Sequence, residues 1–336
     1  MSMTIKDLAR ESGYSLGTVS RVLNGHPNVS EKARKAVMAV VEAQGFELNN
    51  NAKNLKQSRS NSILVVVKGR GNELFAAMVE QLQTIFTPLP YPLIIDYIDE
   101  LDHEVNRAAM LCREKKPQGV LFLGGSYQNF VEDFSKIEVP AVLLTGSAKK
   151  LRFSNLSSVA TDDRKGAACA VEYLLRAGHS DIAVLGGHRQ LSGTSHDRHA
   201  GCLDAYERSG LVFREEQYYT CRFSYQSGYE TMQRVLGSGQ PVSAVFAMAD
   251  VIAVGAIRAI RERGLRIPED ISVMGYDSLE LCDYLMPKLS SVAQPARVMA
   301  QKGAEILLDC IENHGMARHV TVPFSLDCRE SVLVRE

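Results

Sequence analysis

A short segment near the start of the chain carries side chains that could recognise DNA bases. Arg21 can donate two hydrogen bonds to a guanine edge, Leu16 can contact a thymine methyl group, and Gly17 allows a close approach. Other hydroxyl and amide side chains beside them can contact phosphates, which positions a helix without selecting a sequence. These are Thr18, Ser20 and Asn24.

Three short helices are predicted to position these side chains. Thr4, Ser15 and Ser30 are of the types that cap helix N-termini, and each precedes apolar residues at helical spacing. Two brief helices joined by a tight turn, with a third packed behind them, form a helix-turn-helix whose second helix enters the major groove. The alternative is a three-helix packing module in which Arg21 is merely solvated.

This segment resembles the N-terminal signature of the LacI/GalR family of bacterial repressors. The resemblance rests on residues 4–9, Thr-Ile-Lys-Asp-Leu-Ala, and on residues 17–24, Gly-Thr-Val-Ser-Arg-Val-Leu-Asn. It implies that residues 1–48 form a DNA-binding domain.

A polar linker follows at residues 49–60 and is poor in helix-forming residues. In the resembled family this segment becomes a hinge helix on the operator and wedges leucines into a base step of the minor groove. Leu55 stands at the wedge position, and the alternative is a flexible linker with an incidental leucine. Leu48 and Lys53 replace the proline and arginine that are usual in the family.

Residues 61–336 alternate between short apolar runs rich in β-branched residues and amphipathic helical stretches. This pattern predicts parallel sheets with helices on both faces. The rhythm restarts near residue 161, which suggests two lobes with a ligand cleft at the carboxyl ends of the strands. The fold class is therefore α/β, with a helix-turn-helix head attached.

The family resemblance extends over this body through residues 178–179, 198–201, 267–277, 287–292 and 326–331. It implies a periplasmic-binding-protein-like sensor domain whose chain crosses between the lobes three times, near residues 161, 291 and 322. Lobe 1 is expected at about 61–160 and 292–321, and lobe 2 at about 161–291 and 322–336.

Five residues are candidates for binding a small-molecule effector. Arg198 offers a planar fork of donors, and Asp277 can accept from hydroxyls or amines. Both match effector-binding positions of the family, and Thr194 falls where a hydroxyl residue of the family often contacts the ligand. Asn72 and Phe75 lie in the first strand-to-helix loop, where Phe75 could stack on a ring. The alternative for Arg198 and Asp277 is a structural ion pair between the lobes.

Three departures from the family pattern bear on the effector. The loop at residues 68–74 carries Glu73 where proline is usual, Ala249 replaces an asparagine, and Asp163 replaces another. Loss of an amide at position 249 makes an ordinary sugar less certain as the effector.

Bulk properties add limits on compartment and chemistry. Residues 1–60 hold nine Lys or Arg and five Asp or Glu, whereas the whole chain has a net charge of −1, so a basic head precedes an acidic body. The seven cysteines are never spaced as C-x-x-C and favour reduced, buried thiols. Neither a signal peptide nor a long apolar span is evident, and we expect a cytoplasmic protein.

These observations predict a homodimeric transcription regulator that binds double-stranded operator DNA and responds to an effector, a sugar or a related metabolite. Repression is the expected mode; an activator or a corepressor-dependent regulator is the alternative. No catalytic constellation, cofactor loop or convincing metal site is found, since His188, His196 and His199 lack a fixed fourth ligand. A binding protein without a DNA role is a remote alternative, and residues 73–86 are a candidate dimer face.

Overall fold

The computed structural model describes residues 4–23, 26, 28–44 and 60–335. The chain divides into two compact units, Met1–Ser58 and Arg59–Glu336, which are described separately. Within the described residues, no helix is both long and apolar enough to span a membrane.

The described residues of the first unit form three helices, α1 (Ile5–Ser12), α2 (Leu16–Leu23) and α3 (Glu31–Gln44). The Asp7 carboxylate accepts the backbone N–H of Thr4 at 3.0 Å, which satisfies a free donor at the start of α1. Gly13 follows α1 with φ of 71°, a backbone conformation that favours glycine. Leu8, Val19, Val22 and Val37 form the core of this unit. The three predicted helices are therefore present and packed together.

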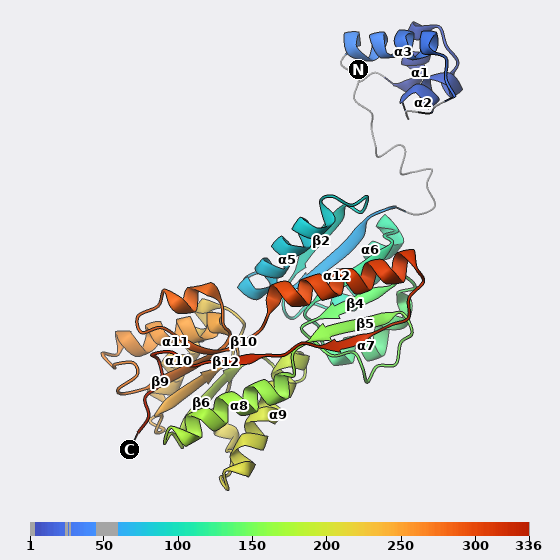
Figure 1. Ribbon diagram of the computed structural model, residues 1–336. Helices are drawn as coiled ribbons and strands as arrows, with labels where there is room; N and C mark the ends of the chain where they lie inside the picture. Colours follow the sequence, from blue (N-terminus) through green and yellow to red (C-terminus); the bar gives the residue numbers. More distant parts are fainter. Residues whose placement is uncertain (1–3, 24–25, 27, 45–59, 336) are drawn as a thin grey trace. The chain divides into compact units, whose positions relative to one another are not determined.

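The second unit contains two six-stranded sheets (Figure 1). The first sheet has the order β11-β5-β4-β3-β1-β2, and every neighbouring pair is parallel. Its strands are β1 (Ile63–Lys68), β2 (Leu93–Ile98), β3 (Gly119–Leu123), β4 (Ala141–Leu144), β5 (Leu156–Ala160) and β11 (His319–Thr321). Helices α5 (Glu73–Phe86) and α12 (Ala296–Glu312) cover one face, and α6 (Glu104–Lys115) and α7 (Tyr127–Asp133) cover the other. We call this lobe 1.

Lobe 2 repeats the arrangement around the second sheet, in the order β12-β10-β9-β8-β6-β7. Its strands are β6 (Ile182–Gly186), β7 (Tyr218–Thr220), β8 (Ala244–Ala247), β9 (Ser272–Asp277), β10 (Ser290–Ala293) and β12 (Ser325–Asp327). Only the pair of β10 with β12 is antiparallel. Helices α8 (Asp163–Arg176) and α9 (Gly193–Arg208) cover one face, while α10 (Tyr225–Gly237) and α11 (Asp250–Glu262) cover the other.

The chain passes between the lobes three times, after β5, after β10 and after β11. Strand β10 ends at Ala293 and belongs to the second sheet, so the second crossing lies just beyond residue 293 rather than near 291. Helix α9 begins at Gly193, because the Ser192 hydroxyl accepts the Ser195 N–H at 3.2 Å and caps the helix. Helix α7 and the strands β5, β10, β11 and β12 were not predicted.

The apolar side of α5 does not form an outer face. Leu74, Met78, Leu82 and Phe86 are each at most 3% exposed and pack in the core of lobe 1. Helix α5 packs on α12 at this side, as Figure 1 also shows. These four apolar side chains therefore do not form a dimer face, because they belong to the core of the lobe. A dimer contact through the exposed side of residues 73–86 stays a prediction.

Candidate functional site

Helix α2 separates its buried and exposed residues as DNA recognition requires. Val19 and Val22 are 0% and 4% exposed and attach the helix to α1 and α3. Leu16, Gly17 and Arg21 are exposed, and Leu16 has 49% of its surface accessible. An exposed, large apolar side chain beside an arginine on one short helix suits contact with base edges.

The hydroxyl residues of α2 lie beside that surface. The Ser15 hydroxyl accepts the Thr18 N–H at 3.2 Å and lies 2.9 Å from the Thr18 hydroxyl, which fixes the first turn of the helix. Thr18 and Ser20 are partly exposed. The predicted contacts of Asn24 and Leu55 lie outside the described residues.

A cavity of about 80 Å³, partly open to solvent, lies between the two lobes of the second unit. Its wall includes residues at or just after the carboxyl ends of β1, β3, β4, β6 and β9, where ligands bind in open α/β sheets. All five predicted effector residues line it, namely Asn72, Phe75, Thr194, Arg198 and Asp277. A second cavity, of about 750 Å³, shares Gly125 and Thr194 with the first, so the space between the lobes continues beyond it.

Arg198 is held firmly by lobe 2. Its Nε donates to Asp163 Oδ1 at 2.8 Å, its Nη1 donates to the Met248 carbonyl, and its guanidinium lies 3.6 Å from the centre of the Tyr276 ring. Arg198 does form a structural ion pair, as the alternative prediction had it, but its partner is Asp163 and not Asp277, and the pair lies within lobe 2 and not between the lobes. The aspartate that replaces the usual asparagine therefore neutralises the arginine of the cavity.

Asp277 ends β9 and is 4% exposed. Burial raises the pKa of its carboxyl above the ordinary range for aspartate, although the charge of Arg198 opposes the shift. Gln294 Nε2 donates to Asp277 Oδ1 at 2.7 Å, and the Thr161 hydroxyl donates to Gln294 Oε1 at 2.9 Å. Thr161 and Gln294 lie in the first two crossings, so this chain of hydrogen bonds joins the cavity to the segments between the lobes.

The other three candidates are placed by local structure. Asn72 caps α5, with its Oδ1 accepting the Leu74 N–H at 3.0 Å. Phe75 is 7% exposed and its ring lies close to Gly124, where a Cβ would approach to 2.9 Å. The Thr194 hydroxyl lies 3.0 Å from that of Ser192 at the start of α9. Asn72 and Phe75 come from lobe 1 and Thr194 from lobe 2, so a ligand here would contact both.

Polar contacts join the lobes along one rim of this cavity. Arg222, after β7 in lobe 2, forms ion pairs with Asp99 and Glu100, which follow β2 in lobe 1; the contact with Glu100 is 2.9 Å. The Phe223 N–H donates to the same glutamate at 3.0 Å, and the Tyr225 hydroxyl donates to Glu73. We call these contacts the rim latch.

Comparison with known proteins places these features in a family. Residues 4–49 match the model for bacterial regulatory proteins of the lacI family, and residues 171–332 match a periplasmic binding protein-like domain. The chain is 34% identical over 98% of its length to the HTH-type transcriptional regulator MalR of Clostridium butyricum, covering 99% of that protein. The chain belongs to the lacI family of bacterial regulatory proteins.

Solved structures agree with this membership of the lacI family. The Lac repressor dimer bound to operator and the anti-inducer ONPF superposes with a TM-score of 0.80 at 26% identity, covering 99% of this chain and 100% of that one. A complex of the transcriptional regulator CelR with cellobiose gives 0.70 at 25% identity, covering 98% and 99%. This lacI-family chain is thus a transcriptional regulator with an effector-binding domain, not an enzyme, and the predicted fold class is confirmed.

Several residues of this regulator's cavity were not predicted as site residues. They are Lys68, Glu100, Thr145, Phe223 and Gln294 among others. Thr145 directly follows β4, has φ of 70°, and its buried hydroxyl has no hydrogen-bond partner among the described residues. Lys68 ends β1 and pairs with the buried Glu104 at 2.5 Å. Because both stand at the carboxyl ends of parallel strands, that position alone could have indicated them.

Proposed function

We propose that this regulator is a dimeric repressor that releases its operator when an uncharged, hydroxyl-rich sugar binds between its lobes. The observation that carries the proposal is the cavity itself, in which residues from both lobes converge on one space that continues into the larger second cavity. A ligand that contacts both lobes binds the open and closed arrangements with different affinities and so shifts the equilibrium between them. Such a shift is what coupling of effector binding to DNA binding requires.

Charge balance in the cavity favours an uncharged effector. Lys68 is paired with Glu104, Arg198 with Asp163, and Glu100 with Arg222. The raised pKa of Asp277 favours its neutral form. A sugar acid or a phosphate would lose hydration there and find each of these cations already engaged by a protein carboxylate.

The wall suits a sugar in shape and in polarity. Phe75 and Phe223 supply ring faces, and Leu74, Leu101 and Leu191 supply further apolar surface. Arg198, Asp277, Gln294 and the Thr145 hydroxyl supply the hydrogen-bonding groups. The solved CelR complex contains cellobiose, which makes that disaccharide a reasonable first probe.

DNA recognition is assigned to the exposed surface of α2. Leu16, Gly17 and Arg21 would contact base edges, with Thr18 and Ser20 on phosphates. Asn24 on a phosphate and Leu55 as a minor-groove wedge remain predictions. Two such heads in a homodimer would bind a pseudo-palindromic operator, as the solved Lac repressor dimer is bound to its operator. We place this activity in the cytoplasm, where bacterial DNA lies.

The decisive experiment measures binding of the purified protein to fragments from its own genomic neighbourhood, in a salt titration with and without cellobiose and a panel of neutral sugars, sugar acids and nucleobases. Tight binding to one palindromic fragment, a steep salt dependence and release by one neutral sugar would support the proposal. Tightening instead of release would indicate a corepressor, and release only by a sugar acid would refute the charge-balance argument. Arg21→Ala and Asp277→Asn serve as variants that separate loss of DNA binding from loss of effector response.

A further inference from the structure

The carboxylate of Asp277 is presented to the cavity by an unusual backbone turn. Asp277 has φ of 113° and Ser278 has φ of 51°, so two consecutive residues with side chains occupy a region that favours glycine. Such residues are energetically disfavoured and persist only where the surrounding structure holds them. Something next to β9 must therefore stabilise this turn.

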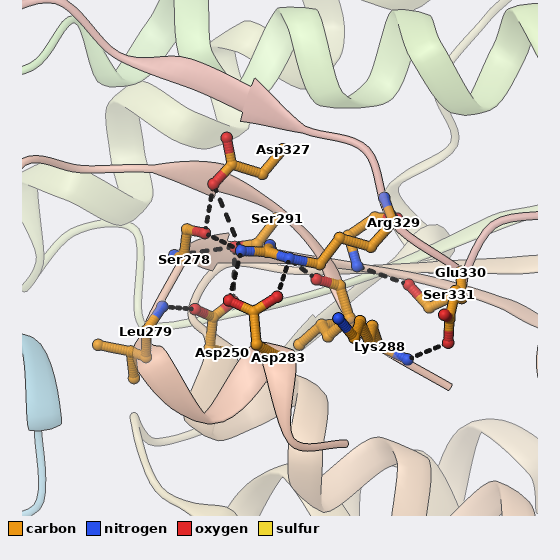
Figure 2. Close-up of polar contacts among 12 residues, drawn as sticks. Asp250, Ser278, Leu279, Asp283, Lys288, Ser291, Asp327, Arg329, Glu330 and Ser331 are labelled. Atoms are coloured by element: carbon orange, nitrogen blue, oxygen red, sulfur yellow. Dashed lines mark hydrogen bonds and ion pairs between the residues drawn. The ribbon is translucent and has the colours of Figure 1, made fainter. Parts of the chain in front are cut away.

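A network of polar groups surrounds the residue that follows Asp277 (Figure 2). The Ser278 N–H donates to the Ser291 hydroxyl at 3.0 Å, and the Ser278 hydroxyl donates to Asp327 at 2.6 Å. The next amide, that of Leu279, donates to Asp250 at 2.7 Å. These partners come from β10, β12 and the start of α11, so the turn is held from three elements.

Arg329 lies at the centre of this network, as Figure 2 shows. Its Nη2 donates to the Ser278 hydroxyl at 3.1 Å, its Nε donates to Asp283 at 3.1 Å, and its Nη1 donates to the Leu289 carbonyl at 3.0 Å. Its side chain is only 15% exposed. A planar fork with several donors is needed to make these contacts together, and a lysine ammonium cannot reproduce them.

We propose that Arg329 is a positioning residue of the effector cavity: through Ser278 it holds the turn that directs the Asp277 carboxylate at the ligand. It does not itself line the cavity. This role rests on the proposed function, because it assumes that Asp277 contacts the effector. Arg329 also connects the cavity to β12, the strand that follows the third crossing between the lobes.

The test measures hydrogen exchange in the full-length protein without ligand. The variants are Arg329→Gln, Arg329→Lys and the double variant Arg329→Gln/Ser278→Gly. The control is Arg266→Gln, which removes an arginine of lobe 2 whose ion pair with Asp270 is largely exposed. Exchange of the Ser278 and Leu279 amides is compared with that of the β6 amides, which report the opening of the lobe as a whole.

Both single Arg329 variants should raise exchange at residues 278–279 by about tenfold over the β6 amides, the size expected for losing a charge-assisted hydrogen bond. The Ser278→Gly change should restore much of the protection, because glycine adopts the positive φ without strain. The control should change nothing. Unaltered exchange at residues 278–279, or an equal rise across β6, would overturn the proposal; if Arg329→Gln does not fold, Arg329→Lys decides.

Calorimetry with cellobiose as the probe separates this inference from the proposed function. If the unsubstituted protein binds cellobiose, the Arg329 variants should bind it about tenfold more weakly, and the glycine double variant should recover part of the loss. Unchanged affinity despite faster exchange would show that the turn does not serve the ligand and would refute the positioning role. If the unsubstituted protein does not bind cellobiose, the exchange data still decide whether Arg329 holds the turn.

Discussion

Replacing Thr145 with valine should stabilise the protein and weaken effector binding at the same time. The Thr145 hydroxyl is buried and has no hydrogen-bond partner among the described residues, although it borders the cavity. Leaving a buried hydroxyl unsatisfied costs about 1–3 kcal/mol. Valine has the same branched shape, so Thr145→Val removes that penalty without creating a cavity or altering the strain at φ of 70°.

The expected gain in unfolding free energy is about 1 kcal/mol, the lower end of that range because the site borders solvent-accessible space. For a unit of this size, this gain raises Tm by about 2 °C. Loss of one hydrogen bond to a sugar hydroxyl should weaken effector binding by about 3–10-fold.

Thr161→Val is the matched control for this prediction. Thr161 is also buried, at 5% exposed, but its hydroxyl donates to Gln294 Oε1 at 2.9 Å. Its replacement should therefore lower the unfolding free energy by about 1–2 kcal/mol, because an acceptor is left unpaired. Differential scanning calorimetry of both variants without ligand, followed by effector titration, makes the comparison. If Thr145→Val lowers Tm as Thr161→Val does, the Thr145 hydroxyl has a partner and the reasoning fails.

Three further predictions follow from the sites described above. Arg21→Ala should cost about 1–3 kcal/mol of discrimination at one base pair, whereas Ser20→Ala should weaken binding to all sequences alike. Competition binding with single-base operator variants measures this difference. A uniform loss of affinity for Arg21→Ala would contradict base recognition by Arg21. Arg222→Gln, which breaks the rim latch, should speed both association and dissociation of the effector in stopped-flow experiments. The control Arg258→Gln, which breaks an exposed ion pair within lobe 2, should change neither rate. Equal rates in both variants would show that the rim latch does not limit entry of the effector. Because burial raises the pKa of Asp277, the folded state holds a proton there that the unfolded chain releases, so stability falls as pH rises from the ordinary aspartate range through the folded pKa. The Tm of Asp277→Asn should therefore decline less between about pH 5 and about pH 8 than the Tm of the unsubstituted protein. Parallel pH profiles of Tm for the two proteins would disprove the pKa shift.

The sequence predicted those features that depend on local pattern. The periodicity of residues 16–23 distinguished the buried Val19 and Val22 from the exposed Leu16 and Arg21, as the structure has them. The apolar runs predicted the central strands of both sheets, and the strand-end rule together with the family resemblance directed attention to Arg198 and Asp277.

Features that depend on distant pairing were not predictable in this way. The counter-ion of Arg198 is Asp163, thirty-five residues earlier in the chain, and only the packing of α8 on α9 brings them together. Gln294 reaches Asp277 because β10 pairs with β9 in one register. The short strands β11 and β12 have three residues each and carry too little periodicity to be recognised.

The order of the elements along the chain has a consequence for biosynthesis. Lobe 1 begins with β1 but is completed only by α12 and β11, which a ribosome makes after nearly all of lobe 2. Until then β5 is an unpaired sheet edge, and the apolar side chains that α12 covers, among them Leu144 and Val159, lack that cover. Lobe 2 can form most of its sheet before lobe 1 is finished, although its last strand, β12, comes later still. A nascent chain of this regulator therefore exposes an incomplete first lobe through most of translation, and a premature stop before residue 296 leaves that surface permanently open to chaperones, proteases or aggregation.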